Sequence, residues 1–300
     1  MFLAGESSLT TKQRGSKMNA EVLKCRIFRN ARNFLYQQGY TETTTQIIRN
    51  TDSGVNRRFR LDNGKFLRDG MDLALKKKVS DITPKVFELG PCFRQDKEDE
   101  THYLEFYMLE TFSGNETLKD MIELMKGLTL QCIPEIVREF KEVSVRDFIA
   151  DDLGIDISVE TTKSLVDTII AKYHGQIERN KLDYVTVNKY ISLCIESSLT
   201  KNGCLCFLVD YPLCTIAIAK RKSQDSNCIL RTECFLNGLE LANGFEDCMD
   251  AKDLEARLIE NNITTVEEEE LLHLTRNGKI PPAAGIGIGI DRLCMLYKGR

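Results

Sequence analysis

The sequence predicts an α+β fold, in which helices flank an antiparallel sheet. Strand-like segments far apart in the chain alternate with segments whose apolar residues have helical spacing. Asn237-Gly238 lies between two strand-like segments and is a dipeptide that strongly favours a two-residue hairpin turn. The length of 300 residues and the hydrophobic content of 42% are sufficient for a sizeable core.

The first half of the chain is expected to begin with a helix over residues 18–38, which Gly39 can end. A strand is expected over 41–48, followed by a loop rich in Gly, Asn and Arg over 51–64 and by a short strand and a helix over 66–79. Two strands, 86–94 and 104–114, are joined by a charged loop, and a helix is expected over 116–142.

The second half begins with residues 150–203, which are mostly helical and polar and resemble an insertion or cap. Strands are expected over 204–211, 229–236 and 239–245 and in the glycine-rich segment after residue 284. Helices are expected over 252–262, over 266–278 and from Asp291 onward, with Asp291 as the N-cap. No repeat or linker interrupts the pattern. We therefore expect a frayed N-terminus at 1–17 and one domain over 18–300.

The composition argues against several classes of protein. The net charge of −4 and the pI near 5.6 give no basic surface for nucleic acid. No apolar run is long enough to span a membrane, and the first residues lack the hydrophobic block of a signal peptide. The 11 cysteines are scattered, with one C-x-C pair and no C-x-x-C pair, which argues against a zinc ribbon or a disulfide framework. We expect a cytoplasmic protein with buried thiols.

The segment GIGIGIDR, residues 285–292, leaves one face of a strand without side chains. Because alternate residues of a strand face opposite sides, the three isoleucines are expected to be buried and the three glycines to lie on the other face. A bare face accommodates a flat group such as adenine or an aminoacyl-adenylate, and Arg292 would then reach a phosphate. The alternative is close packing of a helix against the sheet.

The Asn-Gly hairpin predicts a pair of carboxylates. With Asn237-Gly238 as the turn, Phe235 pairs with Glu240, so Glu233 and Glu240 share one face about 7 Å apart. Oxygen ligands of this kind suit Mg²⁺ held together with nucleotide phosphates. The alternative is a solvated face of the sheet. Gly244 permits a bulge that re-aims Asn243, whose face the spacing does not fix.

The charged loop lies between an arginine and a set of aromatic residues. Arg94 ends the strand 86–94, and His102 ends the loop. Four residues of the next strand share a face by period two: Phe106, Met108, Glu110 and Phe112. The arginine, the aromatic ring and the histidine would form an ATP clamp, with the cation on a phosphate and the ring on adenine. The alternative is that the aromatic residues are core and the loop is a solvated run of charges.

These segments occur in the order of the motifs of class II aminoacyl-tRNA synthetases. VFELGPCFRQDKEDETHYLEFYMLETF resembles motif 2 of that family, and GIGIGIDRLCM resembles motif 3. Within the class, RTECFLNGLELANGF and IPPAAGIGIGIDRL are similar to lysyl-tRNA synthetase and to the truncated ligase that lysylates elongation factor P. The resemblance covers about residues 20–300. It implies a six- or seven-stranded antiparallel sheet flanked by helices and a homodimer formed through motif 1.

The resemblance also implies a role for each matching position. The amino-acid carboxylate would attack the α-phosphorus of ATP, a reaction that depends chiefly on positioning and charge neutralisation. Arg94 and Arg292 would be the catalytic residues, on the α-phosphate and on the outer phosphates. The other nucleotide contacts would be Asp96, His102, Phe106, Gly287 and Gly289, with Glu233 and Glu240 as ligands of Mg²⁺. The amino-acid contacts would be Asp72, Glu110, Phe112, Asn243, Gly244 and Asp247.

Several positions depart from the family pattern. No anticodon-binding barrel fits ahead of residue 20, which makes tRNA the less expected acceptor. The segment that resembles motif 1 is GYTETTTQI, residues 39–47, and its Gln46 stands where the family has proline. Asp96 stands where a glutamate of the family contacts adenine. Gly287 matches the tRNA synthetases, whereas the elongation-factor ligases tend to carry alanine, which implies an α-amino acid.

The amino-acid pocket departs further. Asp72 occupies the position that binds the α-amino group, and Glu110 matches a ligand of the lysine ammonium. Phe112 replaces its tyrosine partner, and Asp247 replaces a second glutamate. The retained acids imply a cationic amino acid that is not necessarily lysine.

The leading hypothesis is an ATP-dependent ligase that forms an aminoacyl-adenylate and transfers the aminoacyl group to a protein acceptor, such as elongation factor P or a carrier protein. A minimal lysyl-type tRNA synthetase or a small-molecule biosynthetic ligase is the alternative among enzymes. A catalytically inactive paralogue with a regulatory or binding role is the alternative of another class. It predicts loss of Arg94, Arg292 or the acidic pair, and all of these are present.

Overall fold

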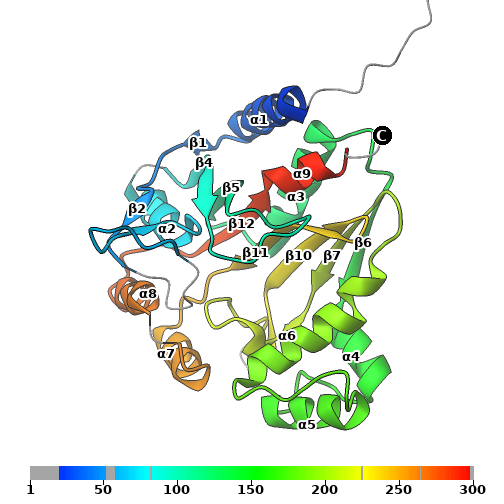
Figure 1. The fold of residues 1–300 in the computed structure, drawn as a ribbon. Helices are drawn as coiled ribbons and strands as arrows, with labels where there is room; N and C mark the ends of the chain where they lie inside the picture. The colour runs from blue at the N-terminus through cyan, green and yellow to red at the C-terminus, as the bar shows by residue number, and fades with distance from the viewer. Residues whose placement is uncertain (1–19, 52–57, 82, 224–225, 264, 298–300) are drawn as a thin grey trace, which may run out of the picture.

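An eight-stranded sheet runs through the centre of the protein in the computed structural model (Figure 1). The structure describes residues 20–51, 58–81, 83–223, 226–263 and 265–297. In order across the sheet the strands are β1 (Thr41–Glu42), β4 (Lys85–Phe93), β5 (Glu105–Gly114), β12 (Ala283–Gly289), β11 (Leu239–Glu246), β10 (Arg231–Leu236), β7 (Cys204–Val209) and β6 (Glu139–Ser144).

The six inner strands pair antiparallel, whereas β1 and β6 run parallel to their neighbours β4 and β7. The predicted α+β class and antiparallel sheet are therefore confirmed, with a parallel strand added at each edge. Two short pairs stand apart, β2 (Ile48–Arg49) with β3 (Phe66–Leu67) and β8 (Tyr211–Pro212) with β9 (Cys228–Ile229). Among the described residues these are all the sheets, so none of them forms a separate barrel.

The helices cover both faces of the sheet (Figure 1). On one face lie α1 (Ala20–Gln37), α3 (Leu118–Cys132) and α9 (Ile290–Met295). On the other lie α2 (Asp72–Asp81) and a group of three, α4 (Val145–Leu153), α5 (Thr162–Lys172) and α6 (Asp183–Cys194). Helices α7 (Ala251–Glu260) and α8 (Val266–Arg276) pack against each other beyond α2.

The first face holds the larger apolar core. Ile286, Ile288 and Ile290 are at most 1% exposed and pack there with residues of α1 and α3. This confirms the predicted burial of the isoleucines, and it leaves the glycines of β12 on the second face, where α2 and the α4–α6 group leave space between them.

Three predicted elements differ from the structure. The helix expected over 116–142 ends at Cys132, because Pro134 follows, and residues 139–144 form the edge strand β6 instead. Of the strand expected over 41–48, only Thr41–Glu42 and the last residue pair with other strands. The N-cap of α9 is Gly289, two residues before the expected Asp291, and it makes no side-chain cap.

Asp291 therefore does not cap α9. Its carboxylate accepts a hydrogen bond from the backbone N–H of Tyr107 at 2.6 Å and pairs with Lys24 at 2.8 Å. These contacts join α9 to β5 and α1.

The helical segment expected over 150–203 contains the end of α4, α5 and α6, all between β6 and β7. A connection between parallel strands requires a long crossover of this kind. Its interpretation as an insertion stays a prediction, and the frayed N-terminus expected at 1–17 lies outside the described residues. Within the described ranges, no helix has the length and apolar character needed to cross a membrane.

Candidate active site

The register of the sheet sets a row of side chains on the second face. Glu110 of β5 pairs with Gly287 of β12, Gly287 pairs with Asn243 of β11, and Asn243 pairs with Glu233 of β10. Because directly paired residues share a face, two acids and an amide lie in line with a glycine among them.

A bulge in β11 brings Asn243 into this row. Phe235 pairs with Glu240, as the hairpin predicts, but Cys234 pairs with Ala242, so Leu241 is the extra residue. The bulge thus precedes Asn243 and does not lie at Gly244, where the sequence allowed one. It settles which face Asn243 occupies, a question that the spacing left open.

A cavity of about 650 Å³ lies over this row, within the range of small-molecule sites. The predicted site residues that line it are Asp72, Arg94, Asp96, His102, Phe106, Glu110, Phe112, Glu240, Asn243, Gly287, Gly289 and Arg292. Glu233, Gly244 and Asp247 are not among the lining residues. The segments that carry the three sequence motifs therefore meet at one cavity.

The three glycines of β12 have different surroundings. Gly287 and Gly289 are half-buried on the cavity floor. A Cβ at Gly285 would lie 2.4 Å from the ring of Phe112, which covers that end of the strand. Close packing thus accounts for Gly285. A Cβ at Gly287 would lie 3.1 Å from the terminal methyl group of Met108, and one at Gly289 would lie 3.4 Å from Arg292, so the atoms nearest to these two glycines from the cavity belong to flexible side chains.

Gly244 faces the opposite side of the sheet. It pairs with Ile286, and a Cβ there would lie 2.7 Å from the carbonyl oxygen of Gly285. Its missing side chain allows β11 and β12 to pack closely.

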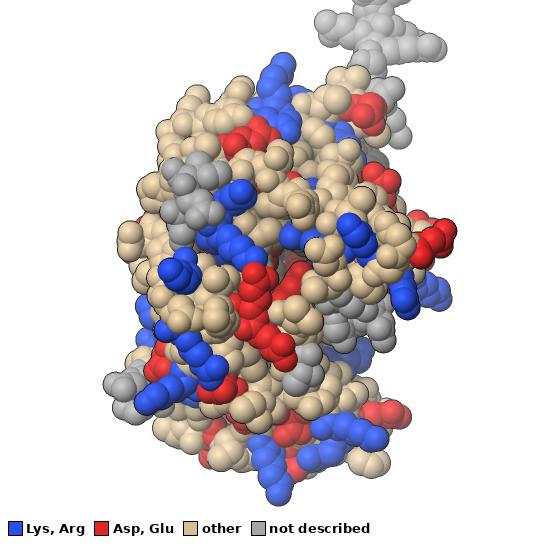
Figure 2. All heavy atoms as spheres, turned by 90° about the vertical axis from the view of Figure 1, so that its left-hand side faces the viewer, with Lys and Arg blue, Asp and Glu red and all other residues tan. Residues whose placement is uncertain are grey.

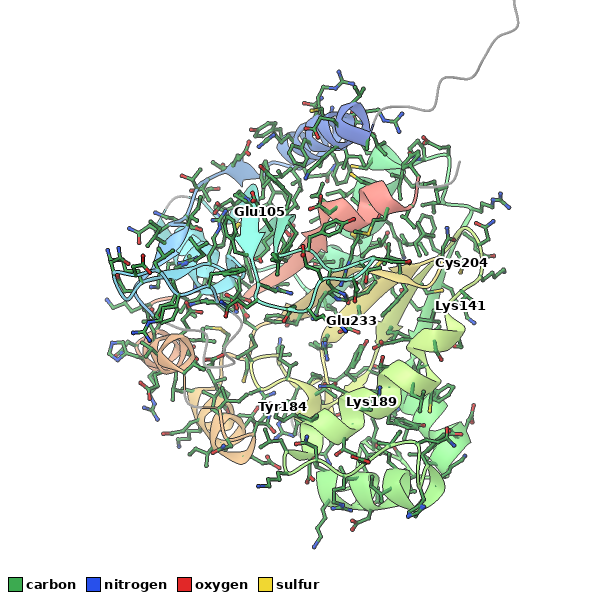
Figure 3. The ribbon with its side chains drawn as sticks, in the orientation of Figure 1. Glu105, Lys141, Tyr184, Lys189, Cys204 and Glu233 are labelled. Atoms are coloured by element: carbon green, nitrogen blue, oxygen red, sulfur yellow. The ribbon has the colours of Figure 1, made fainter. Side chains whose placement is uncertain are left out.

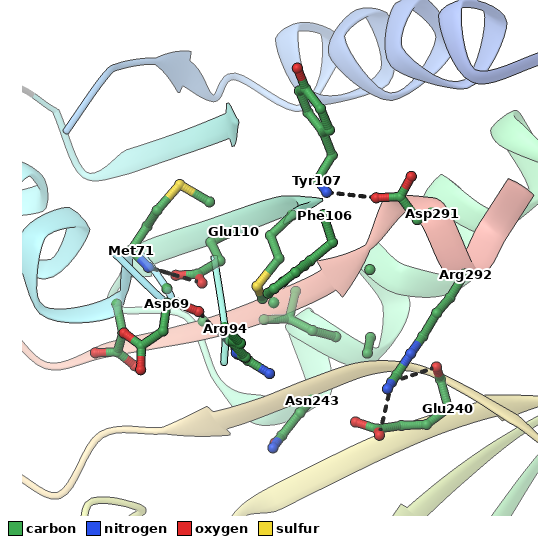
Figure 4. A pocket seen from close by; sticks show the side chains of 18 of the residues that line it. Asp69, Met71, Arg94, Phe106, Tyr107, Glu110, Glu240, Asn243, Asp291 and Arg292 are labelled. Carbon is green, nitrogen blue, oxygen red and sulfur yellow. Dashed lines mark hydrogen bonds and ion pairs between the residues drawn. The ribbon is translucent and has the colours of Figure 1, made fainter. Parts of the chain in front are cut away.

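Two arginines lie at opposite ends of the cavity (Figure 4). The guanidinium of Arg94 donates to the carbonyl oxygen of Asp69 at 3.1 Å and lies 5.0 Å from the ring centre of Phe106. Arg292 pairs with the carboxylate of Glu240 at 2.9 Å, and its guanidinium lies 3.3 Å from Nε2 of His102. The guanidinium groups of Arg94 and Arg292 are held in place by these contacts, and the ring of Phe106 lies at the Arg94 end. This arrangement suits a ligand that has a flat ring and an extended anionic chain.

Glu110 lies at the Arg94 end, beside the backbone of Met71 (Figure 4). It is 6% exposed, and both of its carboxylate oxygens accept the backbone N–H of Met71 at 3.1 Å. Burial, with the charge of Asp72 as a smaller cause, raises the pKa of Glu110 to about 7. A buried acid at the cavity wall is thus poised between its two charge states near neutral pH.

The predicted carboxylate pair is held by arginines. Glu233 points from β10 toward the α4–α6 side, where it accepts the hydroxyl of Tyr211 at 2.7 Å and pairs with Arg231 (Figure 3). Glu240 pairs with Arg292. Among the described residues no group of three or more metal-ligating side chains is assembled. Carboxylate oxygens fit Mg²⁺ in kind, and an ion bound to both would replace an arginine on each.

Several residues at the site escaped the sequence analysis. Arg58, in the loop expected over 51–64, forms a bidentate pair with Glu267 of α8 and binds the carboxylate of Asp69, whose carbonyl holds Arg94. Figure 2 shows acidic side chains gathered beside the hollowed surface, with basic ones on its opposite rim. The sequence contains a run of arginines in this loop and a run of acidic residues at the start of α8. The spacing between the two segments does not predict that they form ion pairs.

Lys76 and Glu196 were also missed. Lys76 follows Asp72 by four residues, a helical spacing that could have linked them, and it pairs with both Asp72 and Asp247. Burial and the charge of Glu233 raise the pKa of Glu196 to about 7. No pattern in the polar segment 150–203 singled Glu196 out.

Comparisons with known proteins agree with this architecture. The family described as tRNA synthetases class II (D, K and N) matches residues 7–300. The chain is similar to the lysine–tRNA ligase of Enterococcus faecalis, with 25% identity over 91% of this chain and 60% of the relative. It is also similar to lysine–tRNA ligase 2 of Methanosarcina mazei, with 27% identity over 93% of this chain and 59% of the relative. The chain thus spans about three fifths of the length of these relatives. Because the family match covers almost the whole sequence, the chain belongs to the class II tRNA synthetases of the D, K and N group.

Proposed function

We propose that the protein activates an amino acid with ATP to form an aminoacyl-adenylate. The observation that carries the proposal is the meeting of three motifs at one cavity: the open glycines of β12, Phe106 with Arg94, and Arg292 with Glu240. The family match and the lysine–tRNA ligases among the relatives support the same class of reaction.

In the proposed reaction, an oxygen of the amino-acid carboxylate attacks the α-phosphorus of ATP, and pyrophosphate leaves with the electrons of the broken bond. Arg94, fixed by the Asp69 carbonyl, neutralises charge at the α-phosphate and orients the carboxylate. The purine stacks on Phe106 above Gly287 and Gly289, and Arg292 exchanges Glu240 for the outer phosphates. A magnesium ion on Glu240 and Glu233 would supply further neutralisation of phosphate charge. No protein nucleophile is needed.

We expect the substrate to be a cationic α-amino acid. Glu110 gives the cavity wall a buried acid, and Asp72 lies half-exposed beside it for the α-ammonium group. The names of the relatives agree with a cationic side chain.

For the acceptor we propose a protein, such as elongation factor P or a carrier protein. The net charge of −4 does not favour a polyanion such as tRNA. The relatives' names favour tRNA, which is therefore the second candidate.

Amino-acid-dependent exchange of labelled pyrophosphate into ATP tests activation. The purified protein is assayed with each of the twenty standard amino acids, ornithine and β-lysine. We expect exchange with at least one cationic amino acid and its loss in Arg94→Ala. Arg179→Ala, which removes an exposed arginine of the segment between α5 and α6, is the matched control. Absence of exchange with every amino acid would favour the noncatalytic alternative, a binding or regulatory paralogue.

Transfer of the labelled aminoacyl group distinguishes the acceptors. Parallel reactions contain elongation factor P, a carrier protein or total tRNA, and the product is treated with protease or ribonuclease. Protease-sensitive label supports the protein acceptor, and ribonuclease-sensitive label alone would replace it with tRNA.

We also propose a homodimer. Val22 and Tyr36 of α1 and Ile47 and Ile48 near motif 1 are 40–58% exposed, so apolar surface is available there. Light scattering at two protein concentrations tests it, and a monomeric mass at both would contradict it. The cytoplasmic location expected from the cysteine usage stays a prediction.

A further inference from the structure

Lys76 of α2 lies behind the wall of the amino-acid end of the cavity, next to the lining residues Asp72 and Phe112, and does not itself line the cavity. Its side chain is 1% exposed, and Nζ lies 2.8 Å from a carboxylate oxygen of Asp247 and 2.8 Å from one of Asp72. The rings of Phe112 and Phe245 flank it, with their centres 5.2 and 4.9 Å from Nζ. These two phenylalanines pair with Gly285 on either side, so the lysine is enclosed at the covered end of the glycine strand.

The pair of Lys76 and Asp247 is charged and faces inward. Burial alone would lower the pKa of Lys76, but the charges of Asp247 and Asp72 reverse that effect and raise the pKa, so the group is an ammonium. Burial raises the pKa of Asp247 to about 6 against the opposing charge of Lys76, so this acid is largely a carboxylate at neutral pH. Asp247 is 5% exposed and does not line the cavity. Its carboxylate is instead paired with the ammonium of Lys76 inside the protein.

The remaining acids of this region are placed differently. We define the inner pocket as Asp72, Lys76, Glu110, Phe112, Phe245 and Asp247. Asp72 lines the cavity with a side chain that is 39% exposed, so it is open to the α-ammonium group of a bound amino acid. Glu110 lines the cavity, is buried, and forms no ion pair with any residue that the structure describes. A buried carboxylate without a cation is costly, and a ligand that supplies one cation relieves that cost.

We propose that Lys76 is a specificity-determining residue that takes Asp247 as its own counterion and leaves Glu110 as the acid that receives a cationic side chain of the substrate. The inner pocket thus presents to the side chain one acid without an ion-pair partner rather than two. Asp247 acts inside the protein and is not a substrate ligand. This inference rests on the proposed function, because it assigns the side-chain subsite of the same cavity.

Lysine and norleucine differ only at the end of the side chain, where lysine carries an ammonium group. The ratio of kcat/KM for lysine to kcat/KM for norleucine therefore measures how strongly the enzyme prefers a substrate with that ammonium group. The ratio is obtained from pyrophosphate exchange; if ornithine is the better substrate, norvaline replaces norleucine. In Asp247→Asn the ammonium of Lys76 keeps only Asp72 as a counterion. Its charge is then less compensated and opposes the substrate ammonium, so we expect the ratio to fall about tenfold or more.

The double variant Lys76→Met/Asp247→Asn removes the ion pair as a unit. We expect it to restore the ratio to within about threefold of the original protein. If Asp247 instead bound the substrate directly, the double variant would keep the low ratio of Asp247→Asn, and that result would overturn the proposal. Glu110→Gln is expected to lower the ratio both in the original protein and in the double variant. An unchanged ratio in Glu110→Gln would also overturn the proposal.

Lys77→Met is the matched control, because Lys77 is the next residue of α2, is 39% exposed and pairs with Glu270 at the surface. Its ratio is expected to equal that of the original protein. If Asp247→Asn fails to fold, the proposal is tested by comparing the ratio of the double variant with that of the original protein. The double variant is expected to fold, because replacing both members of a buried ion pair is far better tolerated than replacing one. Failure of the proposed function is a separate result: the original protein then shows no exchange with any amino acid, whereas failure of this inference leaves exchange intact.

Discussion

The glycines of β12 permit a direct separation of packing from binding. In Gly285→Ala the new Cβ would lie 2.4, 2.6 and 2.7 Å from three ring atoms of Phe112, well inside van der Waals contact. The ring is 3% exposed and packs beside Lys76, so it has little room to move. Overpacking of this kind costs about 1–3 kcal/mol. For a protein of this size we expect Tm to fall by roughly 5 °C.

Gly289→Ala is the comparison variant on the same strand. Its Cβ would meet carbon atoms of Arg292 at 3.4–3.6 Å, an ordinary contact, and the φ of −78° suits alanine. We expect Tm within about 1 °C of the original value, because no atom must shift. The methyl group would lie on the cavity floor, so KM for ATP is expected to rise about tenfold.

Scanning calorimetry and pyrophosphate exchange measure the two effects. A Tm for Gly285→Ala equal to that of the original protein would refute the packing of Phe112 over β12. An unchanged KM for ATP in Gly289→Ala would refute the use of the open glycines as a nucleotide floor.

Three further predictions concern charged groups. Burial raises the pKa of Glu110 from 4.5 to about 7. Between these pH values the native state holds a proton on Glu110 that the unfolded state has lost. The free energy of unfolding therefore falls by on the order of 3 kcal/mol as the pH rises from about 4.5 to 7. Urea unfolding of Glu110→Gln across this range is expected to lack that part of the pH dependence, and a slope equal to that of the original protein would contradict it. Arg292→Ala removes a partly exposed pair with Glu240, so we expect a stability loss below about 1 kcal/mol together with loss of exchange; retained exchange would take Arg292 out of the reaction. Chelation of divalent cations is expected to abolish exchange until Mg²⁺ is restored, and exchange that persists in the chelator would remove the ion from the proposal.

The periodic parts of the fold could be predicted from the sequence. The alternation of isoleucine and glycine in β12 predicted which face is buried, because period two is a local property of a strand. The glycine face lines the cavity at Gly287 and Gly289, but the ring of Phe112 covers it at Gly285, which the alternation alone could not show. The Asn237-Gly238 turn likewise predicted the pairing of Phe235 with Glu240. The end of α3 was misjudged although Pro134 marks it, because apolar residues at helical spacing continue beyond the proline in an edge strand that depends on pairing with β7.

The candidate site was predictable where motifs carried it and not where distant charges meet. The bulge at Leu241 decides the face of Asn243, and single-residue bulges leave no clear mark in a sequence. Lys76 reaches Asp247 across more than half of the chain, so only its neighbour Asp72 was within the range of local spacing. The family pattern assigns Asp247 to substrate binding. A motif pattern carries no information on the pairing of that position with Lys76, which only the folded chain shows.

The central claim is that the open glycines of β12 form the floor of a nucleotide site. A crystal structure with a non-hydrolysable ATP analogue and Mg²⁺ tests it most directly. We expect the purine on Phe106 above Gly287 and Gly289, with the phosphates between Arg94 and Arg292. A nucleotide bound elsewhere, or a floor covered by a side chain of the protein at saturating analogue, would contradict the claim.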